Sequence, residues 1–166
     1  MNSHNDDLVK RMALGAAAGI VGTAAIHVLN TASQKFASVT VPLHRHDPGE
    51  FMVEHAESAL PRETRYRIPP AAEKAAAATL SFGYGATFGA LYAVARDRVE
   101  DPVKEGSLLG ILTWAVGYLG WRPATKITKP VWRESPLKTG AEIARHAVYG
   151  VATAAAYSAL EERLAE

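Results

Sequence analysis

The chain contains no cysteine among its 166 residues. This absence excludes disulfide bonds, thiolate nucleophiles, and zinc or iron–sulfur centres held by cysteine. It leaves the compartment open, because a chain without cysteine is compatible with oxidising and reducing surroundings alike. Every function that depends on a cysteine side chain is therefore excluded.

An excess of charge of either sign is also absent. Eighteen Lys and Arg residues stand against seventeen Asp and Glu residues, which leaves a formal net charge of +1. No whole-molecule field therefore recruits nucleic acid or an acidic partner. The sequence contains no RNA- or DNA-binding motif either, so nucleic acid is not expected as a partner.

Motifs of the common enzyme classes are missing as well. The chain has no GxSxG, no Walker A sequence, no GxGxxG after a strand pattern and no paired-carboxylate arrangement. A hydrolase, a nucleotide enzyme and a dehydrogenase are therefore without support. We expect no enzymatic activity, no catalytic residues and no cofactor.

The most informative feature that is present is a set of four stretches without Asp, Glu, Lys or Arg. They cover residues 12–34, 75–95, 106–121 and 147–160. A bilayer core needs about 20 helical residues, so the first two are long enough to span it. The two shorter stretches would need basic flanking residues whose side chains reach the headgroups. Such flanking residues are Lys104, Arg122, Arg145 and Arg163.

These stretches predict one all-α domain over residues 1–166, a four-helix membrane bundle. The expected helices cover about 8–37, 71–97, 104–121 and 140–165. A soluble bundle would show a polar stripe on each helix at a period near 3.6 residues, and these stretches carry no charge on any face. The low mean hydropathy of the whole chain favours the alternative of a soluble or peripheral protein, but long charged connections account for it.

Glycines at helical spacing predict how these helices pack. In lipid there is no hydrophobic force between helices, so small residues three or four apart allow close backbone contact. We therefore expect a tight bundle or a homo-oligomer. The residues expected at the packing faces are Gly15, Gly19, Gly22, Gly85, Gly89, Gly106 and Gly110.

The segment HRHDPGEF, residues 44–51, predicts the start of a further helix. Asp47 fits the N-cap, Pro48 the first helical position and Glu50 the third, where it reaches back to the cap. The short helix is expected over about 48–60. Its apolar face would hold Met52, Ala56, Ala59 and Leu60, which suits a helix on the membrane surface or against the bundle.

A metal site is the alternative interpretation of the same segment. Nitrogen and oxygen ligands of this kind suit zinc or a related ion. The helix start already explains Asp47 and Glu50, and no HExxH pattern holds the other residues, so no metal is expected. The candidate ligands would be His44, His46, Asp47, Glu54 and His55.

Polar residues within the apolar stretches are the remaining candidates for a functional site. His27, Asn30 and His146 are expected at membrane depth, where polar groups are costly and often functional. Both histidines lie near a predicted helix end, where an imidazole reaches water or headgroups, so a haem between them is disfavoured.

Two further patterns lie near the start of the last predicted helix. Glu142 and Arg145 are three residues apart and are interpreted as a pair on the helix surface. Thr139 and Glu142 match a capping box, which would place the start of that helix at Thr139.

The basic residues indicate an orientation. Residues 121–140 hold five Lys and Arg and two Trp, a composition typical of a loop that contacts anionic headgroups. If all four helices span, residues 122–145 and residues 35–74 share one side and hold twelve basic residues, against six on the other side. The positive-inside rule then places the two connections in the cytoplasm and both termini outside.

Three segments resemble a known family. They are LSFGYGATFGALYAV (Leu80–Val94), GILTWAVGYLGWRP (Gly110–Pro123) and RHAVYGVATAAAY (Arg145–Tyr157). They are similar to the YagU-type bacterial inner-membrane proteins, a family of unknown function, over roughly the second half of the chain. The resemblance implies a multi-pass protein of the bacterial inner membrane and supplies no catalytic residue.

The expected function is that of a structural or stress-related membrane component whose partners are the lipid bilayer and copies of itself. One alternative is a small transporter or channel subunit, which would require His27, Asn30, Thr87 and His146 to converge on one lumen. Another is a soluble or peripheral helical protein that binds a partner.

Overall fold

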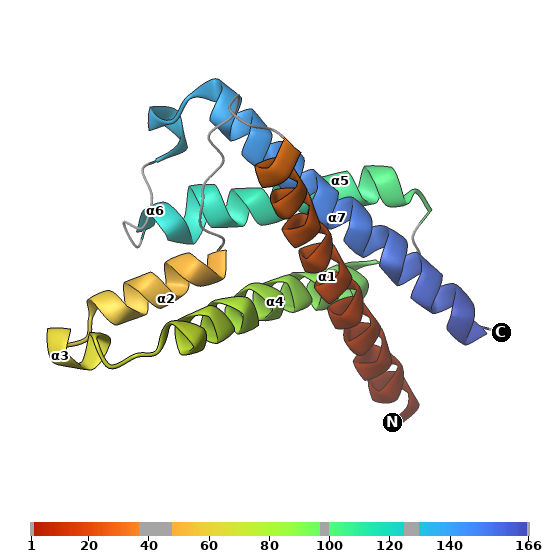
Figure 1. The fold of residues 1–166 in the computed structure, drawn as a ribbon. Coiled ribbons are helices and arrows are strands. Elements are labelled where there is room, and N and C mark those ends of the chain that lie inside the picture. The colour runs from red at the N-terminus through yellow and green to blue at the C-terminus, as the bar shows by residue number, and fades with distance from the viewer. Residues whose placement is uncertain (1, 37–47, 97–99, 125–129, 166) are drawn as a thin grey trace.

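A computed structural model describes residues 2–36, 48–96, 100–124 and 130–165 (Figure 1). These residues form helices and turns without a strand, which confirms the predicted all-α class. The longer helices are α1 (Asn2–Phe36), α2 (Pro48–Ser58), α4 (Pro70–Ala95), α5 (Pro102–Ala115) and α7 (Pro136–Ala165). The short ones are α3 (Arg62–Arg65), the π-helix η1 (Val116–Trp121), α6 (Arg122–Ala124) and the 3₁₀ helix η2 (Val131–Arg133).

Prolines define where most of the longer helices begin. Helices α2, α4, α5 and α7 each start at a proline, because the ring fixes a helical φ and the first residue needs no N–H partner. Asp101 caps α5, and its carboxylate accepts from the N–H groups of Val103 and Lys104 at 3.0 and 3.1 Å. The caps and prolines thus fix the helix starts locally.

The start of α7 differs from the prediction. The helix begins at Pro136, and the Ser135 hydroxyl accepts from the N–H of Lys138 at 3.3 Å. The N–H of Thr139 bonds the Ser135 carbonyl at 3.0 Å, so Thr139 lies inside the first turn. The predicted capping box of Thr139 and Glu142 is therefore wrong, because Ser135 and Pro136 form an earlier start.

The third long helical segment is made of three consecutive pieces. Helix α5 has 14 residues, η1 has 6 and α6 has 3, and they follow one another without a gap from Pro102 to Ala124. Gly120 interrupts the helical dihedrals at φ −97° and ψ −106°, which kinks the segment. Wide π-turns of this kind often lie at functional sites because they displace the side chains that follow.

The long helices form two crossing pairs. Helix α1 packs across α4, α5 packs across α7, and α1 and α7 join the pairs (Figure 1). The first turns of α1, the end of α4, the start of α5 and the end of α7 lie toward the right of Figure 1. Helices α2, α3 and α6 lie toward the left.

All seven glycines expected at packing faces lie where another helix approaches. A Cβ on Gly15 or Gly19 would collide with the backbone of α4, and one on Gly106 or Gly110 with the backbone of α7. Gly22 faces Tyr149 and Thr153 of α7, while Gly85 and Gly89 face α1. Gly150, which the sequence analysis did not include, meets Gly106 and Gly110 from the opposite side.

Helix α2 packs on α4 through its first turn. The N–H of Gly49 donates to the Ser81 hydroxyl at 3.1 Å, and a Cβ at Gly49 would collide with the backbone of Ala77. On the predicted apolar face Met52 is half-buried, but Ala56, Ala59 and Leu60 are exposed. The closest contact is therefore at the glycine end of the helix, and the half-buried face continues through Val53 and Glu57 instead of through the predicted residues.

The described part of the chain contains one helix that is both long and apolar enough to cross a membrane, the stretch Asn5–Ser33 of α1 near the N-terminus. Helices α4 and α7 have 26 and 30 residues, so composition and not length distinguishes them from α1. By length and composition, one of the four predicted spans is therefore a candidate, and insertion of the chain in a membrane stays a prediction.

Candidate functional site: a charged cavity between the helices

A cavity of about 70 Å³ lies between α1, α4, the α5–η1–α6 segment and α7. A space of this size has room for several water molecules, since one water needs about 10–15 Å³, and most of the surface that faces it is apolar although charged residues contribute to it. The cavity is lined by Thr23, Ile26, His27, Ser81, Tyr84, Gly85, Thr113, Tyr118, Arg122, Glu142, Arg145, His146 and Tyr149.

Glu142 and Arg145 form an ion pair in the wall of this cavity. Arg145 Nη1 donates to both carboxylate oxygens of Glu142, at 3.0 and 3.1 Å. Glu142 is only 2% exposed, so the prediction of a helix-surface pair is correct in the partners and wrong in the location. The physical reason is that α7 packs against both α1 and α5, so this face of its first turns is covered.

Arg122 is the second buried guanidinium group. It is 3% exposed, and its Cζ lies 4.1 Å from the ring centre of Tyr118 and 4.5 Å from that of Phe51. Cation–π contacts of this length stabilise a desolvated guanidinium. The expectation that Arg122 snorkels to headgroups is therefore wrong, because the π-turn and the kink at Gly120 precede it and it faces inward.

His146 contacts both the backbone of Glu142 and the aromatic ring of Tyr118. Its Nδ1 lies 2.7 Å from the carbonyl oxygen of Glu142, and because a carbonyl only accepts, Nδ1 carries the hydrogen. The ring meets Tyr118 edge-on at 5.7 Å, and Tyr118 stacks on Trp114 at 5.9 Å. The imidazole is thus held in one orientation at the cavity.

Tyrosines connect the helices around the cavity. The Tyr149 hydroxyl donates to the carbonyl of Gly85 at 2.7 Å, which links α7 to α4 in the buried interior. Tyr84 packs against Phe88 at 4.8 Å, and its hydroxyl accepts from Trp121 Nε1 at 3.4 Å. These contacts fix the walls from two further helices.

Only some of the predicted polar residues meet. His27 and His146 line the same cavity, and His27 stacks on Phe82 at 5.4 Å. Asn30 is half-buried but does not line the cavity, and Thr87 is exposed. Arg122 and Tyr118 also line the cavity but were not predicted as site residues; their spacing of four residues, arginine after an aromatic, was the available signal.

The predicted metal ligands are distributed differently. His44, His46 and Asp47 lie outside the described residues, and His55 and Glu54 are exposed on α2. Within the described ranges no three His, Asp or Glu side chains are close enough together to hold a metal ion.

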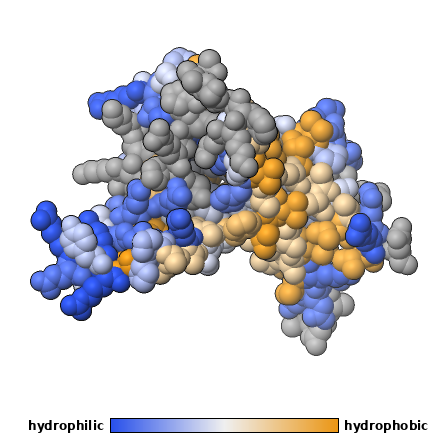
Figure 2. Space-filling model, in the orientation of Figure 1, coloured by the Kyte–Doolittle hydropathy of each residue, from blue (hydrophilic) through white to orange (hydrophobic). Residues whose placement is uncertain are grey.

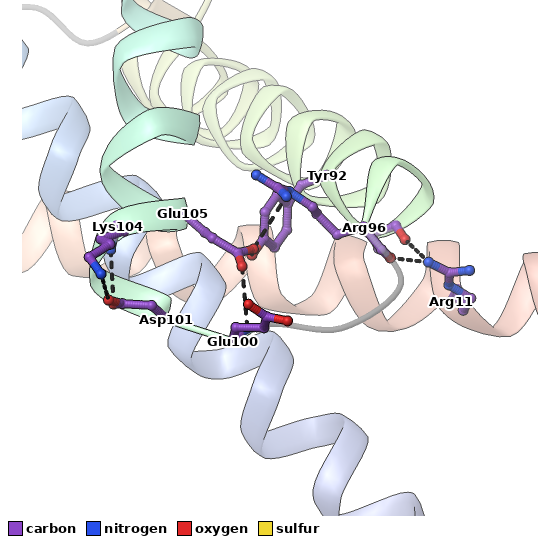
Figure 3. A network of polar contacts seen from close by, with 8 residues as sticks. Arg11, Tyr92, Arg96, Glu100, Asp101, Lys104 and Glu105 are labelled. Carbon is purple, nitrogen blue, oxygen red and sulfur yellow. Dashed lines mark hydrogen bonds and ion pairs between the residues drawn. The ribbon is translucent and has the colours of Figure 1, made fainter.

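A second polar cluster lies at the opposite end of the helices (Figure 3). Glu105 accepts from the Tyr92 hydroxyl at 3.0 Å and from the N–H of Glu100 at 3.2 Å, and Arg96 Nε lies 3.6 Å from the same carboxylate. Arg11 of α1 donates to the carbonyls of Ala93 and Arg96. The cluster holds α1, α4 and α5 together, so its role is structural.

Comparison with protein-family models, with curated proteins and with solved structures finds no match for this chain. The resemblance to the YagU-type family therefore stays a prediction, and the cavity and the surface of the molecule are the features that bear on function.

Proposed function

We propose that the chain is a multi-pass integral protein of the bacterial inner membrane, in which α1, α4, the α5–η1–α6 segment and α7 form a four-helix membrane bundle. The observation that carries the proposal is an inverted distribution of side chains. Large apolar residues are exposed along the long helices, while Arg122, Glu142 and several hydroxyl residues are buried. Water-soluble domains bury apolar side chains and leave charges outside.

The exposed apolar side chains are numerous and occur on each long helix. Val28 of α1 is 70% exposed, Leu91 of α4 56% and Leu112 of α5 53%. In Figure 2 apolar surface gathers over the middle and right of the molecule, between the hydrophilic α2–α3 end and the hydrophilic outer ends of α1 and α7. An exposed apolar surface that extends over several helices suits lipid contact better than contact with water.

The ends of the helices are compatible with four crossings. The start of α1, the end of α4, the start of α5 and the end of α7 lie on one side of the molecule, as four successive spans would require (Figure 1). Helix α5 alone is too short to span a bilayer core. Together with η1 and α6 it forms a described run of 23 residues, from Pro102 to Ala124, which is long enough.

Within the membrane we propose a structural role without catalysis, because the sequence contains no motif of the common enzyme classes. Carriage of a small polar substrate is the second candidate. It is favoured by one observation: His27 and His146, from different helices, line the same charged cavity. An ionisable group at membrane depth is commonly part of a substrate or ion pathway.

Alkaline carbonate extraction of membranes tests the proposal. The chain, expressed with a C-terminal tag, is expected to stay in the membrane pellet through the carbonate wash and to enter solution only with detergent. A known peripheral protein followed in the same fractions is the control. Release of the chain with the peripheral protein would overturn the membrane proposal and favour the soluble or peripheral alternative.

A further inference from the structure

We infer that the cavity binds a small neutral aromatic molecule of the phenol type, whose hydroxyl group bonds to Tyr84 and His146. The inference goes beyond membrane insertion, because it names a class of ligand for the cavity. It depends on three properties of the lining: a mostly apolar surface rich in flat rings, charged groups that already have partners, and two polar groups with unused hydrogen-bonding capacity.

The surface of the cavity suits the ring of such a ligand. Most of this surface is apolar, and the cavity is partly open, so the space free of atoms measures about 650 Å³ when its open side is included. Small-molecule pockets commonly have about 300–1,000 Å³ and walls of apolar and aromatic side chains, on which a ring packs face-on or edge-on. The residues of the described lining that carry a flat ring are His27, Tyr84, Tyr118, His146 and Tyr149.

The charged side chains of the lining favour a neutral ligand, because they already have partners. Glu142 accepts two hydrogen bonds from Arg145. The guanidinium group of Arg122 lies against the rings of Tyr118 and Phe51, and Arg122 and Glu142 each have further contacts. A charged ligand would have to compete with these contacts and would lose its own hydration. A neutral ring with one hydroxyl group loses far less hydration when it enters a mostly apolar space.

Two polar groups of the lining keep unused hydrogen-bonding capacity within the described part of the chain. His146 donates from Nδ1 to the carbonyl of Glu142, so Nε2 of the neutral ring is an acceptor, and no described residue donates to it. The Tyr84 hydroxyl accepts from Trp121 Nε1 at 3.4 Å, and no described residue accepts its hydrogen. A phenolic hydroxyl both donates and accepts, so one group on the ligand serves His146 and Tyr84 together.

Equilibrium dialysis of the detergent-purified full chain against protein-free micelles of the same detergent tests the inference. The probes are phenol, benzene, which lacks the hydroxyl group, and cyclohexanol, which lacks the aromatic ring. We expect saturable binding of phenol to the protein in excess of uptake by micelles. Benzene and cyclohexanol are each expected to bind more weakly, benzene by about three- to tenfold, which corresponds to the net contribution of one hydrogen bond.

Tyr84→Phe separates the hydrogen bond from the ring contacts, because it removes one hydroxyl group from the lining and keeps the ring. We expect the affinity for phenol to fall about three- to tenfold and the affinity for benzene to stay unchanged. Tyr66→Phe is the matched control, because Tyr66 is 89% exposed and lies outside the cavity lining. It is expected to bind phenol as the wild type does.

Ile26→Phe provides a second test if Tyr84→Phe does not fold. Ile26 is half-buried in the lining, so a larger side chain there reduces the space and is expected to weaken phenol and benzene together, several-fold. A wild-type chain without saturable binding of phenol would overturn the inference. So would equal affinities for phenol and either analogue, or wild-type affinity for phenol in Tyr84→Phe or in Ile26→Phe. Carbonate extraction requires no ligand, so this inference and the membrane proposal fail separately.

Discussion

At the scale of single residues, the buried charges set the energetics of the interior. An ion pair gains attraction inside a protein but loses hydration, so an intact buried pair contributes little while a broken one is costly. Glu142 and Arg145 are 3% and 12% exposed at their side chains, well below Glu134 and Lys138 at 21% and 22%. Two ion pairs of different burial thus lie close together, one within α7 and one that joins Lys138 of α7 to Glu134 just before the helix.

These two pairs lead to a comparison of stability. Glu142→Ala leaves Arg145 without its carboxylate in the interior, and we expect a loss of about 3–5 kcal/mol in the free energy of unfolding. Glu134→Ala removes a more accessible pair and is expected to cost about 1 kcal/mol or less. Denaturant titration in detergent measures both. Equal losses would mean that the interior around Glu142 is hydrated.

The cap of α5 adds a pH dependence outside the helices. Hydrogen bonds from the backbone and side chain of Lys104 lower the pKa of Asp101 below its ordinary 3.8. A lowered pKa in the folded state means that the ionised cap stabilises the fold above the unfolded pKa and loses this effect as the pH falls through the folded value. The stability advantage of wild type over Asp101→Ala is therefore expected to be constant from pH 7 to about 5 and to shrink below pH 4. Thermal unfolding of both proteins across this range measures it, and an advantage that persists unchanged below pH 3 would contradict the assignment.

At the scale of elements, backbone contacts at glycines decide how the helices meet. Gly89 and Gly83 both lie on α4, but a Cβ on Gly89 would lie 2.8 Å from Gly19 Cα, and one on Gly83 meets nothing within 4 Å. Backbone atoms cannot move aside as the end of a flexible side chain can. The α1–α4 crossing therefore admits no side chain at Gly89.

Alanine at these two positions should act in opposite directions. Gly89→Ala must separate α1 from α4, and we expect a loss of about 1–3 kcal/mol, the usual cost of overpacking. Gly83→Ala is expected to gain about 0.5–1 kcal/mol, because alanine restricts the unfolded chain and suits an exposed helix. Unfolding of the two variants side by side measures the difference. A gain at Gly89 would show that the crossing is looser than described.

The sequence predicted these elements better than their faces. Charge-free stretches located the long helices, and Pro48 the short one, since both signals act locally; the starts of α1 and α7 lie six and four residues before the predicted ones. The face of α7 that buries Glu142 depends on α1 and α5, which approach from distant parts of the chain, so spacing alone indicated a surface pair. The π-turn before Arg122 has no sequence signal that distinguishes it from an ordinary helix. The inward position of Arg122 depends on that turn, so this position was not predicted either.

At the scale of the whole molecule, an apolar exterior around a charged cavity requires an environment that both parts tolerate. Exposed side chains such as Val28 and Leu112 gain nothing from water, while Arg122 and Glu142 are compensated inside. The basic residues lie mainly in the connections on the α2–α6 side. The proposed membrane orientation places that side in the cytoplasm.

The absence of cysteine makes this orientation directly measurable, because one introduced thiol is unique in the chain. Tyr66→Cys and Trp132→Cys place it at residues 89% and 77% exposed in the two basic connections. A membrane-impermeant maleimide is expected to label both only after the cells are permeabilised, and to label Glu100→Cys in intact cells, because Glu100 lies between α4 and α5 on the opposite side. Leu112→Cys, on the proposed lipid-facing surface, should react in neither condition until detergent is added. Labelling of Leu112→Cys in intact membranes would remove α5 from the bilayer, and labelling of Tyr66→Cys from outside would reverse the orientation.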